Sequence, residues 1–124
     1  MIDHLIIKVS NIEKSKAFYI KALQPLGYRL GEVYEGWGCG FECEGKRVFW
    51  IGTPKVGEKI GQSHIAFAAK TRALVDDFYN AAMKAGGKDK GAPGLREKYH
   101  ENYYGGFVFD PDGNNIEAVC HKPE

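Results

Sequence analysis

The sequence has no surplus of charge of either sign, no long apolar run and no C-x-x-C pair of cysteines. Its 17 Lys and Arg residues nearly balance its 16 Asp and Glu residues. No basic stripe is interleaved with aromatic residues, so nucleic acid is not expected as a partner. The first residues, MIDHLIIKVS, hold too short an apolar stretch for a secretory signal or a membrane span. We therefore expect a cytoplasmic protein that binds neither nucleic acid nor membrane.

The cysteines and glycines also limit the kind of protein. Cys39, Cys43 and Cys120 are odd in number and lack C-x-x-C spacing, which argues against a disulfide framework and a structural zinc site. The 16 glycines are spread among strand-like segments and do not form a linker. A chain of 124 residues has the length of one domain. We therefore predict a single globular domain over residues 1–124.

What the sequence does contain is an internal repeat. Residues 64–91 align with residues 4–31 without a gap, and six positions are identical. Roughly two identities would be expected from average residue usage of about 6% per position. The identical pairs are His4 and His64, Phe18 and Phe78, Tyr19 and Tyr79, Ala22 and Ala82, Gly27 and Gly87, and Gly31 and Gly91. A duplicated module explains this match.

Each copy has the pattern of a strand, a helix and three further strands. HLIIKV and HIAFAA are short apolar strands. Ser10 and Glu13 have the form of a capping box, and Thr71 is expected to cap the second helix. Apolar residues at helical spacing follow both caps, and Gly86 and Gly87 are expected to end the second helix. The later strands are expected at about 27–35, 37–44 and 46–52, and at about 88–92, 105–110 and 114–121.

These elements predict an α+β fold of two βαβββ modules, about 1–57 and about 58–124, whose mostly antiparallel sheets form a cup. Side chains alternate across a strand. His4, His64 and Glu117 all fall on the face of their strands that points away from the helices. If the sheets curl toward each other, the three side chains converge inside the cup. Two imidazoles and one carboxylate suit a divalent first-row cation with open coordination positions.

The segments IDHLIIKVSNIEKSKAFY, QSHIAFAA and FVFDPDGNNIEAV resemble the vicinal oxygen chelate superfamily. This group includes glyoxalase I, fosfomycin-resistance enzymes, bleomycin-resistance proteins and extradiol dioxygenases. The resemblance implies the cup-shaped fold of paired βαβββ modules and a homodimer. It also implies a metal site of His4, His64 and Glu117 that holds zinc, manganese, nickel or iron. Glu117 is additionally expected to take part in catalysis.

One position departs from the pattern of that superfamily. Many members supply a fourth ligand from the last strand of the first module, where this sequence has Trp50, or Phe49 if the register slips by one. Neither side chain binds a metal, so lactoylglutathione lyase activity in the strict sense is not expected. Trp50 and Phe41 are instead expected to form an apolar wall that contacts a flat substrate.

A polar and aromatic loop is predicted over residues 94–106, and loops of this kind often carry function. Arg96 and Tyr103 are expected to bind substrate, the former through a carboxylate or phosphate. His100 and Tyr104 are expected to transfer protons near the metal. The alternative is a solvated loop whose aromatic side chains only fix it to the domain.

The expected activity is that of a metal-dependent enzyme acting on a small molecule with two adjacent oxygens. The cation would stabilise negative charge in an isomerase, lyase or transferase reaction. One alternative is a ring-cleaving dioxygenase, since two His and one carboxylate leave room for a catecholate and O₂ on Fe(II). The other is a metal-free protein that binds a small molecule or antibiotic, as bleomycin-resistance proteins do.

Overall fold

The computed structural model describes all residues, 1–124, as eight strands, two α-helices and one short 3₁₀ helix. In chain order the elements are β1 (Leu5–Lys8), α1 (Ile12–Leu23), η1 (Gln24–Leu26), β2 (Arg29–Tyr34), β3 (Gly38–Cys43), β4 (Lys46–Gly52), β5 (His64–Ala68), α2 (Arg72–Lys84), β6 (Lys88–Leu95), β7 (Tyr104–Phe109) and β8 (Asn115–Cys120). Neither helix has the length and apolar character needed to cross a bilayer.

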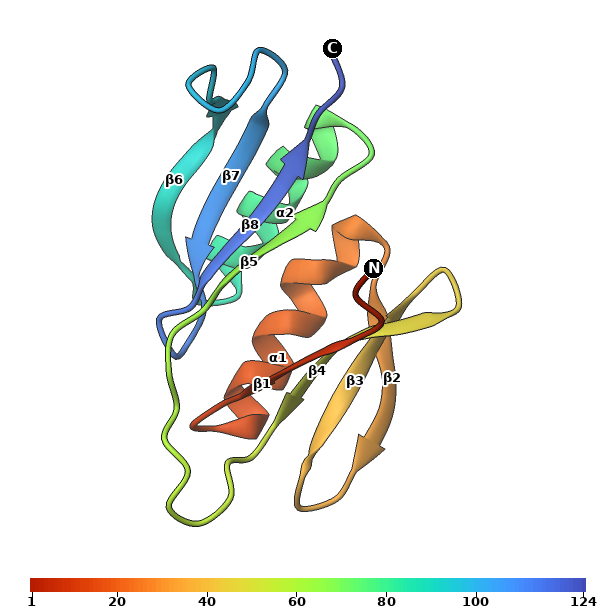
Figure 1. The fold of residues 1–124 in the computed structure, drawn as a ribbon, viewed down its shortest axis with the longest axis vertical. Helices are drawn as coiled ribbons and strands as arrows, with labels where there is room; N and C mark the ends of the chain where they lie inside the picture. The colour runs from red at the N-terminus through yellow and green to blue at the C-terminus, as the bar shows by residue number, and fades with distance from the viewer.

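The strands form two separate four-stranded sheets with the same internal order, β1-β4-β3-β2 and β5-β8-β7-β6 (Figure 1). In each sheet the first strand pairs in parallel with the last, and the remaining pairs are antiparallel. Ile6 pairs with Trp50, and Ala66 pairs with Glu117. The predicted α+β fold of two βαβββ modules is therefore confirmed, while the two sheets do not join into one.

The helix starts confirm one predicted cap and correct the other. Thr71 accepts a hydrogen bond from the Leu74 amide at the start of α2, as expected. The N-cap of α1 is Asn11, whose side chain accepts from the Lys14 amide. The predicted capping box at Ser10 is wrong because Ser10 uses both its amide and its hydroxyl to contact the Asp112 carboxylate.

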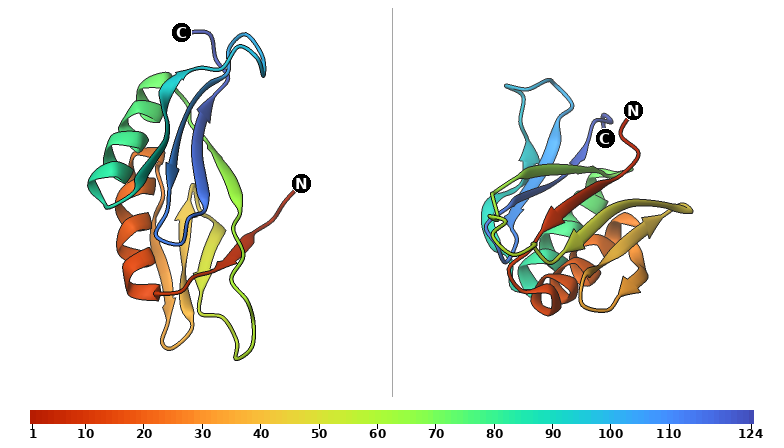
Figure 2. Two further views of the ribbon diagram at one scale, coloured as in Figure 1. Left: turned by 90° about the vertical axis from the view of Figure 1, so that its left-hand side faces the viewer. Right: turned by 60° about the horizontal axis from the view of Figure 1, so that its bottom comes forward.

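Both modules share one hydrophobic core. The two helices pack against each other on one side of the molecule, with the strands on the other side (Figure 2). Phe49 on β4 and Phe67 on β5 meet edge to face with ring centroids 5.3 Å apart. The core cluster of 18 buried residues draws on both halves of the chain. Because Ile7 and Val9 are buried while Ile6 is exposed, the predicted orientation of β1 is also correct.

The turn between β7 and β8 is a buried polar junction between the modules. Asp110 is only 5% exposed, and its carboxylate accepts hydrogen bonds from the Tyr19 phenol of α1 and from the Asn114 amides. Asn114 in turn accepts from the Ser63 amide before β5. The DPDGN segment therefore positions the start of β8, which carries Glu117, against both α1 and β5.

Candidate functional site

Glu117 is the central residue of the candidate site. It lies in the middle of β8, between the core residues Ile116 and Ala118, and points to the opposite, helix-free face. Its side chain is nevertheless only 1% exposed. A buried carboxylate needs polar partners on both oxygens. Glu117 has them, since His64 Nε2 lies 2.9 Å from Oε1 and the Tyr103 phenol donates to Oε2.

Tyr103 reaches Glu117 from the loop before β7. Burial and its hydrogen bond to Glu117 raise the pKa of the phenol well above its ordinary value, so the phenol keeps its proton at neutral pH. Gly105 makes this contact possible. A Cβ added there would lie 3.1 Å from Tyr103 Cε1 and 3.2 Å from Glu117 Oε2, so a larger residue would press on both groups.

An open cavity of about 470 Å³ lies against this carboxylate. Its walls combine the polar groups of the site with aromatic rings, namely His64, Tyr99, His100, Tyr103, Phe107 and Glu117. Phe107 on β7 pairs with Glu117 across the β7–β8 hairpin, and its ring lies 6.3 Å from the His64 ring. A small molecule in the cavity would meet one carboxylate, one imidazole and one phenol against an apolar wall.

Arg96 places a positive charge beside this cavity. Its guanidinium lies over the Phe107 ring, 5.2 Å from the ring centroid, and donates to the Ala92 carbonyl oxygen at 2.7 Å. Gly91 and Gly94 leave space for it, since a Cβ at either would lie 3.2 or 3.1 Å from a guanidinium nitrogen. No carboxylate of the chain pairs with Arg96. Its remaining donors are therefore free for an anionic group.

His100 lines the cavity and contacts His121, which follows β8. The two imidazole nitrogens lie 2.6 Å apart, and the rings stack with centroids 4.8 Å apart. Tyr103 contacts both rings, with centroid separations of 5.4 and 5.3 Å. This contact connects the loop to the C-terminal end of β8 and holds Tyr103 in place.

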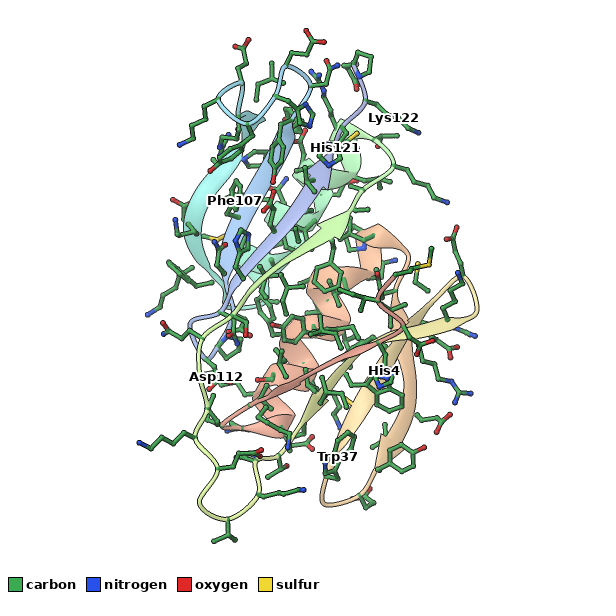
Figure 3. The ribbon with its side chains drawn as sticks, in the orientation of Figure 1. His4, Trp37, Phe107, Asp112, His121 and Lys122 are labelled. Carbon is green, nitrogen blue, oxygen red and sulfur yellow. The ribbon has the colours of Figure 1, made fainter.

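His4, the third predicted metal ligand, belongs to the other module. Figure 3 shows His4 and Trp37 on the first module, and Phe107 and His121 on the second. The His4 side chain is 52% exposed and contacts Asp3. One chain therefore brings together two of the three predicted donors, and no group of three His, Cys, Asp or Glu in it is arranged to hold a metal.

Trp50 lies where it was predicted, in the last strand of the first module at the position of the fourth ligand in many members of the superfamily. It pairs with Ile6 as Glu117 pairs with Ala66, so the two residues are equivalent in the repeat. Its indole covers Gly40, where a Cβ would come within 2.8 Å of the ring. The rings of Tyr34, Trp37 and Trp50 lie within 6.3 Å of one another and form an aromatic surface on the helix-free face of the first sheet.

Two predicted site residues lie elsewhere. Phe41 is fully buried on the helix side of β3, where it packs against Tyr19 and Phe49, so its predicted place in the cup is wrong. Tyr104 begins β7 on the helix side and donates to Asp76 of α2 at 2.7 Å, which excludes the predicted role near the metal. Side chains alternate between the two faces along a strand. Phe41 and Tyr104 each lie next to a glycine that faces the cup, so both of them point to the helix side.

The loop is shorter than predicted, since β6 extends to Leu95 and β7 begins at Tyr104. Sequence reasoning missed Tyr99, Phe107 and His121. Phe107 could have been found by pairing the strands across the DPDG turn, which sets it opposite Glu117. Nothing in the sequence pattern indicates that Tyr99 and His121 approach the cavity, because their positions depend on how the loop folds back.

The donors present supply two of the three predicted protein ligands of a divalent metal site. His64 Nε2 and Glu117 Oε1 are ligand atoms of the types that zinc, manganese, nickel and iron accept in proteins. The buried carboxylate has no cationic side chain fixed beside it, since His64 is its one ion-pair partner. A third donor must come from outside this arrangement to complete the site.

Comparisons with known proteins agree with the fold. A family model described as Glyoxalase/Bleomycin resistance protein/Dioxygenase superfamily matches residues 1–118. The structure is similar to a glyoxalase/bleomycin resistance protein from Albidiferax ferrireducens, with 30% identity, a TM-score of 0.84, and coverage of 95% of this chain and 97% of that one. No match is found among curated proteins.

Two further solved structures share the fold at lower identity. A glyoxalase/bleomycin resistance protein/dioxygenase family enzyme from Burkholderia phytofirmans is 21% identical, with a TM-score of 0.74 and coverage of 98% of both chains. A lactoylglutathione lyase from Agrobacterium tumefaciens is 18% identical, with a TM-score of 0.71 and coverage of 97% of this chain and 92% of that one.

Proposed function

This chain belongs to the glyoxalase/bleomycin resistance protein/dioxygenase superfamily, and we propose that it is an enzyme that uses a divalent cation to act on a small molecule with two adjacent oxygens. The observation that supports this most is Glu117. It is 1% exposed, lies at the wall of a cavity and is held between an imidazole and a phenol, and a buried, oriented carboxylate in a cavity is a candidate for binding a ligand.

We propose that a second copy of the chain completes the site. His64 and Glu117 of one copy would be joined by His4 of the other, which is half exposed and whose side chain bonds to Asp3. The repeat favours a two-fold arrangement, because the helix-free face of the first module would then meet that of the second module twice. Such a homodimer would have two identical sites.

In this proposal the bound cation would act as a Lewis acid toward the substrate oxygens. Tyr103 would hold a proton at its phenol oxygen, which donates to Glu117 in the free protein and could turn to a substrate oxygen instead. Glu117 would accept a proton or a hydrogen bond on its free lone pairs. His100 would relay protons between the mouth of the cavity and solvent, since an imidazole can donate at one ring nitrogen and accept at the other.

Arg96 indicates the charge of the substrate. Its guanidinium is fixed by Phe107 and the Ala92 carbonyl oxygen, and no carboxylate of the chain neutralises it. Planar guanidinium groups recognise carboxylate and phosphate oxygens in pairs. We therefore propose a substrate with an anionic group. Trp50 of the second copy would provide the opposing aromatic wall, which suits a flat or apolar body.

The aromatic surface of Tyr34, Trp37 and Trp50 favours a second candidate, ring cleavage of an aromatic diol on iron with O₂. The separation of His4 from Glu117 in one chain favours a third, a metal-free protein that binds a small molecule. The metal requirement separates the third candidate from the other two, and the identity of the active metal separates the first from the second.

Elemental analysis of protein purified without chelator tests the proposal. We expect zinc, manganese, nickel or iron in near-stoichiometric amount in the wild type and a large loss in Glu117→Gln and His64→Gln. Glu101→Gln is the control, because it makes the same change at a Glu outside the ligand set, and it should retain metal. Equal and negligible metal in the wild type and Glu117→Gln after supplementation with each of the four would reject the metal-dependent enzyme.

A further inference from the structure

A second cavity, of about 550 Å³, lies between the two modules. It shares no residue with the cavity at Glu117. Its floor is apolar and comes from three elements: Leu26 of η1, Ala68 at the end of β5, and Leu74 of α2. A cavity of this size with an apolar floor is in the range that small-molecule sites occupy.

Tyr28 adds a hydrogen-bonding group to this floor. Its ring packs edge to face on Phe67, with centroids 5.4 Å apart, and is half buried. Its phenol oxygen makes no hydrogen bond within the chain, unlike those of Tyr19, Tyr34, Tyr79, Tyr103 and Tyr104. Burial and the nearby Cys43 and Glu44 raise the pKa of the phenol, so it is a proton donor at neutral pH.

The rim of the cavity carries an excess of positive charge. Lys70 and Lys122 both line it, together with Glu44. Lys70 forms an ion pair with Glu44 at 3.0 Å, whereas Lys122 pairs with no carboxylate of the chain. Two ammonium groups therefore face a single carboxylate, and Glu44 is exposed enough to turn away. Lys122 extends from the segment after β8 (Figure 3).

We propose that this cavity binds a small amphipathic carboxylate, which is an anion with a short apolar tail. The tail would lie on Leu26, Ala68 and Leu74, and the carboxylate would contact Lys122, Lys70 and the Tyr28 phenol. A neutral or cationic molecule of the same length has the apolar tail but lacks the negative charge that the two lysines favour. The cavity spans η1 of the first module and α2 of the second, so an occupied cavity would hold the modules together.

Cys43 provides a direct reporter of occupancy. Its thiol lines the cavity and is partly exposed, while Cys39 and Cys120 are each 1% exposed. Hexanoate, 1-hexanol and hexylamine share one chain length and differ in charge. We expect hexanoate to slow modification of Cys43 by a thiol reagent at fixed pH and to raise the melting temperature, and the other two to do neither. Isothermal titration with hexanoate measures the affinity independently of Cys43.

Variants of the rim make the test specific. Lys122→Gln and Lys70→Gln should each weaken hexanoate binding about threefold to fivefold, the effect of one solvent-exposed charge. Glu44→Gln should strengthen it, because it releases Lys70. Lys21→Gln, on the exposed side of α1, is the control and should leave it unchanged. The proposal is overturned if hexanoate at millimolar concentration neither binds nor protects Cys43, if hexanol and hexylamine protect equally, or if all four variants behave alike.

Discussion

The Tyr103 phenol donates a hydrogen bond to one oxygen of Glu117, while His64 Nε2 lies 2.9 Å from the other. The two partners come from different elements, since His64 begins β5 and Tyr103 ends the loop before β7. The carboxylate is thus fixed from both sides although its strand is otherwise apolar. Tyr103 is a positioning residue for the proposed metal site, in the sense that it orients a ligand without being one.

Tyr103→Phe should lower metal affinity about tenfold, the effect usually seen when a partner of a metal ligand is removed. It should also lower the free energy of unfolding by about 1 kcal/mol, because one oxygen of a buried carboxylate loses its donor. Tyr99→Phe lines the same cavity but removes no hydrogen bond, and it should change neither quantity. Metal titration and urea unfolding of both variants check this, and equal behaviour of the two would contradict it.

Gly105→Ala should have a similar effect by a different route. The added Cβ would lie 3.1 Å from Tyr103 Cε1 and 3.2 Å from Glu117 Oε2, so one of them must move. We expect weaker metal binding and a loss of about 1 kcal/mol in unfolding free energy, typical of mild overpacking. Gly61→Ala is the matched control, since nothing lies within 4 Å of a Cβ there. Wild-type metal affinity in Gly105→Ala would show that Tyr103 does not orient Glu117.

Stability should decline in alkaline solution. Burial, followed by the charge and hydrogen bond of Asp110, raises the pKa of Tyr19 well above its ordinary value. A group whose pKa is higher in the folded state stabilises fully below its unfolded pKa, about 10 for Tyr, and loses this contribution as the pH rises further. Urea unfolding at a series of pH values, from neutral to above the unfolded pKa of Tyr, should therefore show a falling free energy of unfolding.

Tyr19→Phe separates this contribution from that of other groups. The variant should be less stable at neutral pH by about 1–3 kcal/mol, because the buried Asp110 loses a donor. Its stability should then fall less steeply with alkaline pH than that of the wild type. Identical slopes for the two proteins would mean that the bond between α1 and the β7–β8 turn does not link stability to pH.

Trp50→Glu should strengthen metal binding if two copies form the site, because Trp50 is the counterpart of Glu117 in the repeat. The new carboxylate would provide a fourth donor from the first module. Val48→Glu is the control, since it places the same group two residues earlier on the same face of β4, and it should not strengthen binding. Titration with Zn²⁺ and Mn²⁺ measures both, and equal affinities would place Trp50 away from the metal.

The sequence was sufficient to predict those features of the fold that follow from the internal repeat and from the alternation of side chains along a strand. The two modules, the helix-free orientation of Glu117 and the register of Trp50 all follow from periodicity and from the constant offset between His4 and His64. The prediction that placed Phe41 in the cup was wrong, although the same alternation gives its core position, since Phe41 pairs with the buried Phe49.

Other features depend on contacts between distant segments, which periodicity does not describe. Ser10 matches a capping box, but Asp112 from the β7–β8 turn competes for it and Asn11 takes over the cap. The burial of Glu117 depends on Tyr103 folding back over Gly105. How the two sheets are arranged in space depends on the shared core and on any second copy of the chain.

The measurement that tests the central claim most directly uses a mixed dimer of two variants that each lack one proposed metal ligand. His4→Gln and Glu117→Gln are co-expressed with different affinity tags, and the species carrying both tags is isolated. If each site takes His4 from one copy and Glu117 from the other, both lesions fall in one site and the second site is intact. We predict about half of the wild-type metal content in the mixed species and almost none in either variant alone. A mixed species as poor in metal as the single variants, or a wild type that is purely monomeric at micromolar concentration, would contradict the account.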